Sequence, residues 1–268
     1  MGLIGLITDF GLKDEYVGVM KAVILGRAPQ ATIVDVCHGV DPQDVLQAAY
    51  VLEAARRYFP AGSLHVVVVD PGVGTERAIL IVEAGGQRFL APDNGVLSFV
   101  LEPAFHPRCR ILEPAAVTSG PVSATFHGRD LIAPAAGLLA NGLDPEALGP
   151  EIPASKARRL EGLRPERTPE GALAGRVIHI DRFGNLITNI AAEDLPAGGA
   201  GVRIEAGGVR LEGLHRTYAE APPGGLIALV GSRGLIEIAA AGGHAANRTG
   251  IEKGAPVLVE IRRGEPAR

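Results

Sequence analysis

Leu64-His-Val-Val-Val-Val-Asp-Pro-Gly-Val-Gly-Thr-Glu-Arg77 joins an unbroken apolar run to a polar turn that contains two glycines. The four consecutive valines, residues 66–69, do not alternate with polar residues. This is typical of a strand covered on both faces, as in a parallel sheet. Glycines at positions 72 and 74 let the backbone turn tightly afterwards. We therefore expect a buried strand whose carboxyl end presents Asp70 and leads through a loop to Arg77.

On both sides of this run, residues 1–150 alternate short apolar segments with helical patterns, which predicts an α/β domain with a largely parallel sheet. The helix before the valine run should have Asp41 as its N-cap and Pro42 at its first position. A second helix is expected from near Asp130 to Asn141, where Asn141-Gly142 ends it. The expected strands are residues 3–8, 32–36, 64–69 and 79–82.

The character of the sequence changes at residues 151–170, where proline, arginine and glutamate replace the apolar periodicity. We interpret this stretch as a linker. Residues 171–268 contain short β-rich runs separated by glycines, which predicts a small all-β barrel domain. Its expected strands are residues 176–180, 186–190, 202–204, 227–230, 235–238 and 257–261.

The composition is that of a globular protein, since 47% of the 268 residues are hydrophobic and 21% are charged. No apolar run approaches the roughly 20 residues that a membrane-spanning helix needs. The formal net charge of −4 provides no basic face, which argues against a nucleic-acid partner. The first residues are typical of a strand rather than a signal peptide, and Cys37 and Cys109 lie in apolar stretches. We therefore expect a cytoplasmic protein with reduced thiols.

The first polar cluster, Thr8-Asp-Phe-Gly11, directly follows the first expected strand. In open α/β sheets, ligands collect at the carboxyl ends of the strands. The carboxylate of Asp9 has the acceptor oxygens needed to bind both hydroxyls of a ribose. It could equally cap a turn or the helix expected over residues 16–27. The residues alone leave both interpretations open.

Two further clusters carry candidate catalytic groups. Asp70 and Arg77 flank the glycine turn, where they could act on a substrate or form an ordinary structural ion pair. Thr125-Phe-His-Gly-Arg-Asp130 places His127 at the mouth of a helix. A single histidine is more often structural than catalytic, and Asp130 could be no more than an N-cap. Both clusters therefore remain open at this level.

The C-terminal domain contributes a polar loop, Asp181-Arg-Phe-Gly-Asn185. It sets the polar groups of Asp181 and Asn185 around Phe183, an aromatic ring that could stack on a base. Glycine and asparagine also belong in β-turns, so a purely structural turn fits the same residues.

A second C-terminal loop, Gly231-Ser-Arg-Gly234, offers the hydroxyl of Ser232 and the forked guanidinium of Arg233. That pair suits a carboxylate, although a β-turn again fits equally well. The histidines and cysteines of the chain show no metal-ligand spacing, so no metal site is predicted.

Taken in this order, the clusters resemble those of one family, the S-adenosylmethionine (SAM) hydroxide adenosyltransferases, or SAM hydrolases, which are relatives of the SAM-dependent fluorinase and chlorinase. The resemblance extends from residue 3 to about residue 262, and six motifs in register make it specific. The matching stretches are Ile7-Thr-Asp-Phe-Gly11 with Tyr16-Val-Gly-Val-Met-Lys21, Asp70-Pro-Gly-Val-Gly-Thr-Glu-Arg77, Ala91-Pro-Asp-Asn-Gly95, Phe126-His-Gly-Arg-Asp130, Asp181-Arg-Phe-Gly-Asn185 and Gly231-Ser-Arg-Gly234.

This resemblance implies hydrolysis of SAM to adenosine and methionine by water or hydroxide attack at C5′, without a metal or other cofactor. It also implies a homotrimer in which the barrel domain of one subunit completes the SAM site of a neighbouring subunit. The implied water-handling triad is Asp70, Arg77 and His127. The residues implied for binding are Asp9 at the ribose, Asp181 and Ser232 at the methionine group with Arg233 nearby, and Phe183 and Asn185 at the adenine.

Two positions favour a hydrolase over a halogenase. Where the fluorinase has a tyrosine near the ribose this chain has Asp70, and where the fluorinase has a fluoride-binding serine it has Gly128. A carboxylate at position 70 would repel an anionic nucleophile. The chain departs from the family in Ala241-Gly-Gly243, where an asparagine is usual, so adenine contacts from that loop are not predicted. His244 has no assigned role.

Three alternatives to a metal-independent SAM hydrolase are compatible with the same residues. The first is a chlorinase-type halogenase, which would keep the fold and the SAM site. The second is a protein that binds SAM or adenosine without turnover. The third is a metal-dependent hydrolase that uses Asp9, Asp70 and His127, although no ligand spacing supports it.

Overall fold

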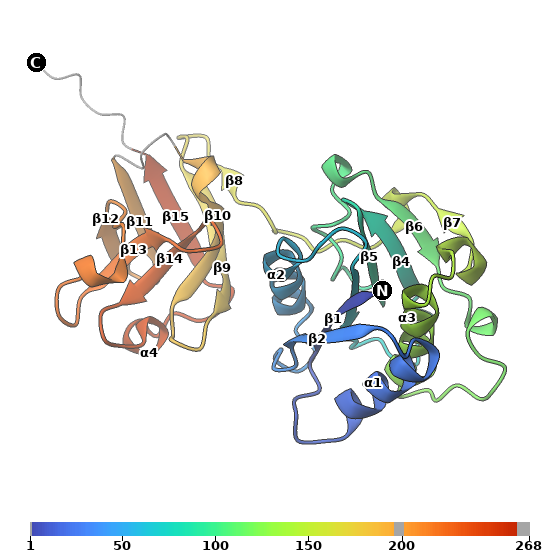
Figure 1. Ribbon diagram of the computed structural model, residues 1–268. Helices are drawn as coiled ribbons and strands as arrows, with labels where there is room; N and C mark the ends of the chain where they lie inside the picture. The colour runs from blue at the N-terminus through green and yellow to red at the C-terminus, as the bar shows by residue number, and fades with distance from the viewer. Residues whose placement is uncertain (1, 196–200, 262–268) are drawn as a thin grey trace, which may run out of the picture. The chain divides into compact units, whose positions relative to one another are not determined.

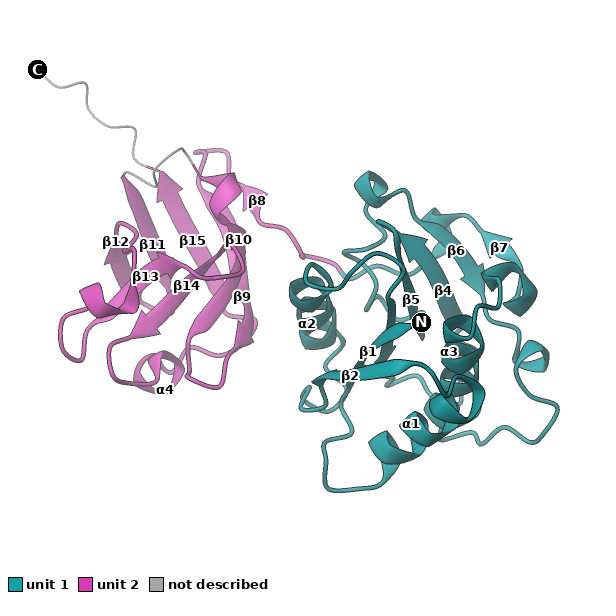
Figure 2. Cartoon of the chain, in the orientation of Figure 1, with its two compact units in different colours: residues 1–160 teal, residues 161–268 magenta. Residues whose placement is uncertain are grey.

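The chain forms two compact units, residues 1–160 and 161–268, in the computed structural model, which describes residues 2–195 and 201–261 (Figures 1 and 2). The division falls within the stretch interpreted as a linker. Residues before it fold with the first unit, where the Leu160 N–H donates to Ser98 Oγ at 2.8 Å. Residues after it fold with the second, where Arg176 donates to the Glu161 carbonyl at 2.6 Å.

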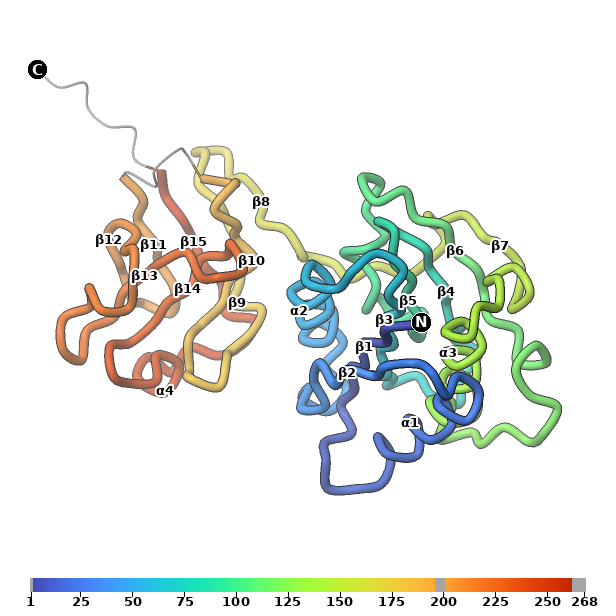
Figure 3. Tube along the Cα trace, viewed as in Figure 1, coloured from blue at the N-terminus to red at the C-terminus, as the bar shows by residue number. Residues whose placement is uncertain are grey.

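A seven-stranded sheet in the order β2-β1-β3-β5-β4-β6-β7 forms the centre of the first unit (Figure 3). Its strands are β1 (Leu3–Thr8), β2 (Thr32–Cys37), β3 (Leu64–Val68), β4 (Ile79–Ala84), β5 (Gln87–Pro92), β6 (Arg108–Ile111) and β7 (Glu151–Ile152). Its helices are α1 (Tyr16–Arg27), α2 (Val45–Arg56) and α3 (Ala133–Ala140), with a π-helical turn at Gly128–Ile132 directly before α3.

The valine strand lies between two helical layers, as its sequence predicts. Val66 and Val68 pack into the apolar cluster beneath α1 and α3, whereas Val67 and Val69 pack into the cluster beneath α2. All four side chains are buried, and complete burial of such a side chain stabilises the fold by about 1.5–3 kcal/mol. The strand is therefore covered on both faces.

The prediction of a largely parallel sheet is only partly correct. Strands β2, β1, β3 and β5 are parallel, but β4, β6 and β7 pair antiparallel. The reason is the two-residue turn Gly85-Gly86, whose φ angles of 57° and 77° are those of a tight hairpin. Because so short a connection can only join antiparallel strands, β5 folds back against β4 and takes the place beside β3.

The predicted N-cap of the helix before the valine strand is wrong. Helix α2 begins at Val45, and Asp44 rather than Asp41 caps it by accepting a hydrogen bond from the Gln47 N–H at 2.9 Å. The cause is Gln43, whose φ of 67° interrupts helical backbone between Pro42 and Asp44. The second predicted helix is present as the π-helical turn followed by α3, and Asn141 is its C-cap.

The second unit is a near-closed antiparallel barrel, which agrees with the predicted barrel domain. Its main sheet has the order β12-β11-β15-β9-β10-β14-β13, with β8 paired to β9. The elements are β8 (Glu166–Arg167), β9 (Leu173–Ile180), β10 (Leu186–Ala191), β11 (Val202–Ala206), β12 (Val209–Glu212), β13 (Leu226–Val230), β14 (Leu235–Ala240), β15 (Pro256–Ile261) and one short helix, α4 (Ala245–Thr249).

The predicted strands of this unit all exist, within a few residues of the expected bounds. The sequence did not indicate β12, whose alternating residues are only half-buried. Within the two described segments of the chain, no helix is long and apolar enough to cross a membrane.

Candidate functional site

The carboxyl edge of the first sheet brings two of the predicted polar clusters together. Strands β1 and β3 are parallel neighbours, and Thr8 lies opposite Val68 in their register. Asp9 follows β1 immediately and Asp70 follows the end of β3. The two carboxylates therefore leave adjacent strands at the same edge of the sheet, where open α/β sheets bind ligands.

Arg77 is in direct contact with both Asp70 and His127. Arg77 Nε donates to both carboxylate oxygens of Asp70, at 2.9 and 2.8 Å, and Arg77 Nη2 donates to Asp70 Oδ2 as well. The same Nη2 lies 2.9 Å from His127 Nδ1. The side chains of Asp70 and Arg77 are only 6% and 5% exposed, so salt screens this ion pair less than it would an exposed pair.

This contact fixes the protonation of His127. A guanidinium has no acceptor atom, so Arg77 must donate and His127 Nδ1 must accept. The neutral ring then carries its proton on Nε2. Burial and, after it, the positive charge of Arg77 lower the pKa of His127, which favours this neutral form.

The segment that holds His127 is braced by a small aromatic cluster, which the sequence did not indicate. The rings of Phe10, Tyr16 and Phe126 lie 5.2 to 5.7 Å apart, so they connect the end of β1 and the start of α1 to the residue before His127. Such edge-on contacts contribute about 0.5–1.5 kcal/mol each beyond area burial.

Asp130 does not act as a helix cap. Its carboxylate pairs with Arg129 at 2.6 Å and accepts the Ser123 N–H at 2.8 Å. The Arg129 guanidinium lowers the pKa of Asp130, and the Ser123 N–H acts in the same direction. This local pair is separate from the Asp70–Arg77 pair.

Asp9 is bound by the segment after β2, a contact that the sequence analysis did not predict. Its Oδ2 accepts a hydrogen bond from the Gln43 N–H at 2.9 Å, and the Gly11 N–H donates to the His38 carbonyl at 2.7 Å. Helix α1 begins after Glu15 without a side-chain cap, so Asp9 does not cap that helix. The carboxylate therefore sits on the turn between β1 and α1, supported by the segment that follows β2.

A chain of polar groups supports the same turn, buried at Thr8 and His38 but reaching solvent at Lys21 and Asp35. The Thr8 hydroxyl lies 2.9 Å from His38 Nδ1, and it accepts the Phe10 N–H at 3.3 Å. On its other side His38 Nε2 lies 3.0 Å from Asp35 Oδ1, and Lys21 Nζ donates to Asp35 Oδ2 at 2.6 Å. Thr8 is fully buried, so its hydroxyl positions the turn and does not reach a substrate.

The second unit contains a cavity of about 830 Å³ that collects the other predicted site residues. Asp181 Oδ1 accepts the N–H groups of Phe183 and Asn185, both at 2.9 Å, and Oδ2 accepts the Asn185 side-chain amide at 3.0 Å. The turn is thus rigid, while the Phe183 ring is 75% exposed. The lining includes Asp181, Phe183, Asn185, Ser232 and Arg233 together with Ala241, Gly242 and Gly243.

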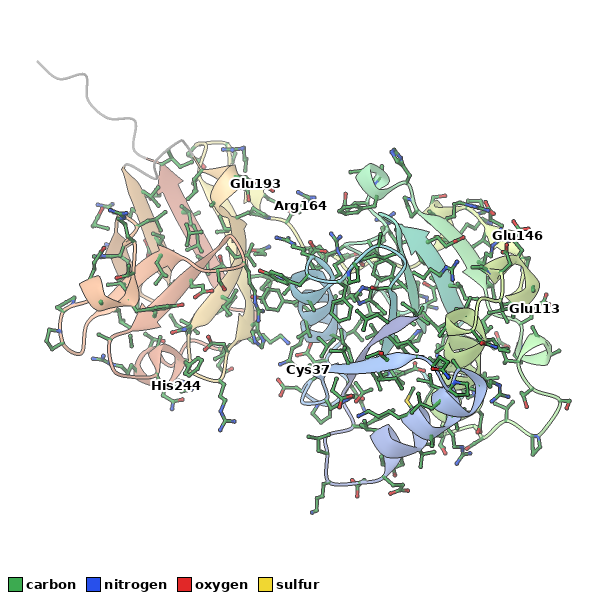
Figure 4. All side chains as sticks on the ribbon, viewed as in Figure 1. Cys37, Glu113, Glu146, Arg164, Glu193 and His244 are labelled. Carbon is green, nitrogen blue, oxygen red and sulfur yellow. The ribbon has the colours of Figure 1, made fainter. Side chains whose placement is uncertain are left out.

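Two residues that line this cavity were missed by the sequence analysis, and His244 was left without a role. Tyr218 and Glu237 line it, and the Tyr218 hydroxyl donates to Glu237 Oε2 at 2.8 Å. Glu237 sits between isoleucines on β14, a pattern typical of a solvent-facing side chain, yet it is only 5% exposed. His244 caps α4 by accepting the Asn247 N–H at 3.2 Å, and it is labelled at that helix in Figure 4.

The predicted residues thus form two groups, Asp9, Asp70, Arg77 and His127 in the first unit and the cavity residues in the second. Among the residues that the structure describes, no three His, Cys, Asp or Glu side chains gather in a way that could hold a metal ion.

Comparisons with known proteins cover both units. The family model of the SAM hydroxide adenosyltransferase N-terminal domain matches residues 4–149, and that of the C-terminal domain matches residues 175–258. An (R)-S-adenosyl-L-methionine hydrolase from Thermus thermophilus is 44% identical over 94% of this chain and 96% of its own length. A fluorinase from Nocardia brasiliensis is 30% identical over 97% of each chain.

A solved structure has the same fold. An uncharacterized conserved protein from Thermotoga maritima superposes with a TM-score of 0.86 at 34% identity, over 97% of this chain and 100% of that one.

Proposed function

The chain belongs to the SAM hydroxide adenosyltransferase family, and from this premise we propose that it is an enzyme that hydrolyses S-adenosyl-L-methionine to adenosine and L-methionine. Four relatives named (R)-S-adenosyl-L-methionine hydrolase, at 35–44% identity, support this reaction. The observation on which the proposal rests in this chain is the contact of Arg77 with both Asp70 and His127.

The reaction is a displacement at C5′. A bond forms between the water oxygen and C5′ while the bond from C5′ to the sulfonium sulfur breaks, and the electron pair leaves with the sulfur as neutral methionine. Such a leaving group needs no general acid, and no redox change occurs, so we propose that no cofactor takes part. The difficult part is the nucleophile, because water must lose a proton as it attacks.

We propose that Asp70 accepts the proton that the attacking water loses. Arg77 keeps one carboxylate edge occupied, but each oxygen retains further lone pairs that can accept from water. His127 is a donor through Nε2 in its neutral form, so it orients the water oxygen instead of removing its proton. General-base assistance of this kind contributes about 10²–10⁴ in rate, and in-line placement of the water adds to it.

For substrate binding we propose that Asp9 accepts the ribose hydroxyls, and that Phe183 and Asn185 bind the adenine. Asp181 and Ser232, with Arg233, would bind the methionine group, and the cavity that these residues share in the second unit supports the assignment.

The remaining proposals concern assembly and compartment. We propose a homotrimer in which the second unit of one subunit completes the site of its neighbour. The unpaired thiols of Cys37 and Cys109 support a cytoplasmic location. Mixing an Asp70→Asn variant with an Arg233→Ala variant tests the shared site. Partial recovery of turnover by two inactive variants supports it, and no recovery contradicts it.

The geometry at Gly128 supports water over a halide as the nucleophile. A Cβ placed there would lie 3.2 Å from the Phe126 ring, 3.3 Å from Val68 and 3.4 Å from Met20. A serine, the fluoride-binding residue at this position in the fluorinase, therefore fits only if these side chains move. The Asp70 carboxylate adds repulsion against an anion.

Incubation of the protein with SAM in ¹⁸O-labelled water tests the proposal. Adenosine that carries ¹⁸O at its 5′-hydroxyl supports attack of water at C5′. Unchanged SAM, or a product formed only with added halide, contradicts it and supports a binding protein or a halogenase respectively.

Variants then test the triad. Asp70→Asn and His127→Ala should each lower turnover at least about tenfold while SAM still binds. Glu113→Gln is the matched control, because it removes an exposed carboxylate of the same unit (Figure 4). Near-normal turnover in both triad variants would refute the assigned roles.

A further inference from the structure

Glu237 is a buried carboxylate that the proposed reaction does not use. It lies on β14, is 5% exposed, and lines the cavity of the second unit together with Asp181 and Arg233. A carboxylate in such a place is costly unless it is hydrogen-bonded or meets a positive charge. Its retention in the cavity wall therefore needs a physical reason.

The surroundings of Glu237 hold it firmly in one position. The Tyr218 hydroxyl donates a hydrogen bond to Oε2 at 2.8 Å. Burial of the tyrosine and the neighbouring Glu237 carboxylate raise the pKa of Tyr218 to about 12, so its hydroxyl remains a donor. On the other side Glu237 Oε1 packs against Gly231, where any Cβ would overlap it. The carboxylate thus rests against the loop that carries Ser232 and Arg233.

The charges facing Glu237 do not balance within the cavity. The loop between β9 and β10 supplies Asp181, whose oxygens already accept three N–H groups of their own turn. The loop between β13 and β14 supplies Arg233, and the segment before β13 supplies the neutral Tyr218. Two carboxylates against one guanidinium leave the ionised lining with an excess of one negative charge.

We propose that Glu237 is a specificity-determining residue that makes this cavity select a sulfonium-bearing amino acid over the corresponding thioether. The inference rests on the proposed function, because it takes the methionine end of SAM as the occupant. That end carries an ammonium, a carboxylate and a sulfonium, with a net charge of +1. S-adenosylhomocysteine and the product methionine lack the sulfonium, and their amino-acid ends are neutral overall.

The effect on binding follows from Coulomb's law. A unit charge in a partly buried site interacts with another across several ångströms far more strongly than it would in water, because the effective dielectric constant is about 20 rather than 80. Electrostatic complementarity of this kind discriminates between ligands more than it raises affinity in general. Loss of the sulfonium charge on hydrolysis would also weaken retention of methionine.

Burial raises the pKa of Glu237, and Asp181 acts in the same direction, whereas the Tyr218 hydroxyl and Arg233 oppose it. A cationic ligand favours the ionised carboxylate, so binding of SAM should weaken at acid pH more than binding of a neutral thioether.

The test compares two ligands in one assay. For the wild-type protein and Glu237→Gln, we would measure KM for SAM and the inhibition constant of S-adenosylhomocysteine from pH 5.5 to 8. Glutamine keeps the shape and an oxygen acceptor for Tyr218 but removes the charge. We expect KM for SAM to rise about tenfold or more, the inhibition constant to change less than about twofold, and the pH dependence of their ratio to flatten.

Glu193→Gln serves as the matched control, because it removes an exposed carboxylate from the same unit (Figure 4). If Glu237→Gln fails to fold, Tyr218→Phe provides a second route. It keeps the carboxylate of Glu237 but removes the hydrogen bond that favours its ionised form, so the preference for SAM should persist at pH 8 and be lost at a higher pH than in the wild type.

Each contrary result has a distinct meaning. Equal weakening of both ligands, or no change in either, overturns the inference while leaving SAM hydrolysis standing. Loss of the preference for SAM in Tyr218→Phe at pH 8 also overturns it. A wild-type protein that neither turns over nor binds SAM overturns the proposed function and the inference with it.

Discussion

Replacement of His65 by phenylalanine should remove one defined contribution to the acid sensitivity of the first unit. His65 lies on β3 and is fully buried. Its ring stacks on Phe89 at 5.1 Å between centroids and meets the edge of Phe59 at 4.8 Å. Neither ring nitrogen has a hydrogen-bond partner among the described residues. A protonated imidazole is therefore strongly disfavoured at this position.

The magnitude follows from the pKa of this group. Burial lowers the pKa of His65 from 6.5 to about 4, the charge of Arg56 adds to this, and the Gln87 amide partly opposes it. Because the unfolded chain binds the proton more readily, the stabilising contribution is complete above about pH 6.5 and is lost as the pH falls toward 4. The full difference corresponds to about 3 kcal/mol of unfolding free energy.

Urea unfolding followed by circular dichroism, at a series of pH values from 7 to 4, measures this contribution. The His65→Phe variant should have an unfolding free energy that depends less on pH than the wild type, by about 3 kcal/mol across the range. Phenylalanine is larger than histidine and lies beside Gly5, so a constant loss of about 1–3 kcal/mol from overpacking is expected at all pH values. The change of the unfolding free energy with pH, and not its value at any one pH, therefore tests the prediction.

A matched control removes an exposed histidine instead. His106→Asn keeps a residue that tolerates the φ of 49° at that position and should leave the pH dependence of the wild type unchanged. If the wild type and His65→Phe differ by the same amount at pH 7 and at pH 4, the reasoning is refuted. If the two units unfold in separate transitions, only the transition of the first unit should respond.

Three further predictions concern the candidate site and its supports. Because burial and Arg77 lower the pKa of His127, turnover should stay level as the pH is lowered from 8 to about 6.5 and decrease only below that. A turnover that already decreases as the pH is lowered from 8 to 7 would contradict this. Gln43→Gly relieves a positive φ and keeps the N–H that binds Asp9, so melting temperature and KM should stay the same or improve slightly. Gln43→Pro cannot adopt the positive φ and has no N–H to bind Asp9, so it should raise KM for SAM. Equal KM values for the two variants would argue against the support of Asp9 by the residue 43 backbone. Asp44→Ala should cost about 1 kcal/mol of stability in urea unfolding through loss of the α2 cap, whereas Asp41→Ala should not, and the reverse order would contradict the assigned cap.

The sequence predicted the positions of those site residues that directly follow a strand. Asp9 and Asp70 come immediately after apolar runs, so their place at the carboxyl edge of the sheet can be read along the chain. The contact of Arg77 with His127 could not be read in this way, because the two residues are 50 positions apart and only the packing of the π-helical turn against β3 brings them together.

Local pattern determined much of this protein by itself. The valine run specified a strand covered on both faces, and the glycine-punctuated second half specified a barrel, because burial along one element appears as periodicity in its own residues. Only the tertiary structure determined which strands and which side chains lie next to one another. It placed β5 between β3 and β4 and buried Glu237 against Tyr218. The physical reason is that a hydrogen bond or a strand pairing between distant residues depends on how whole elements pack, which no single stretch of sequence encodes.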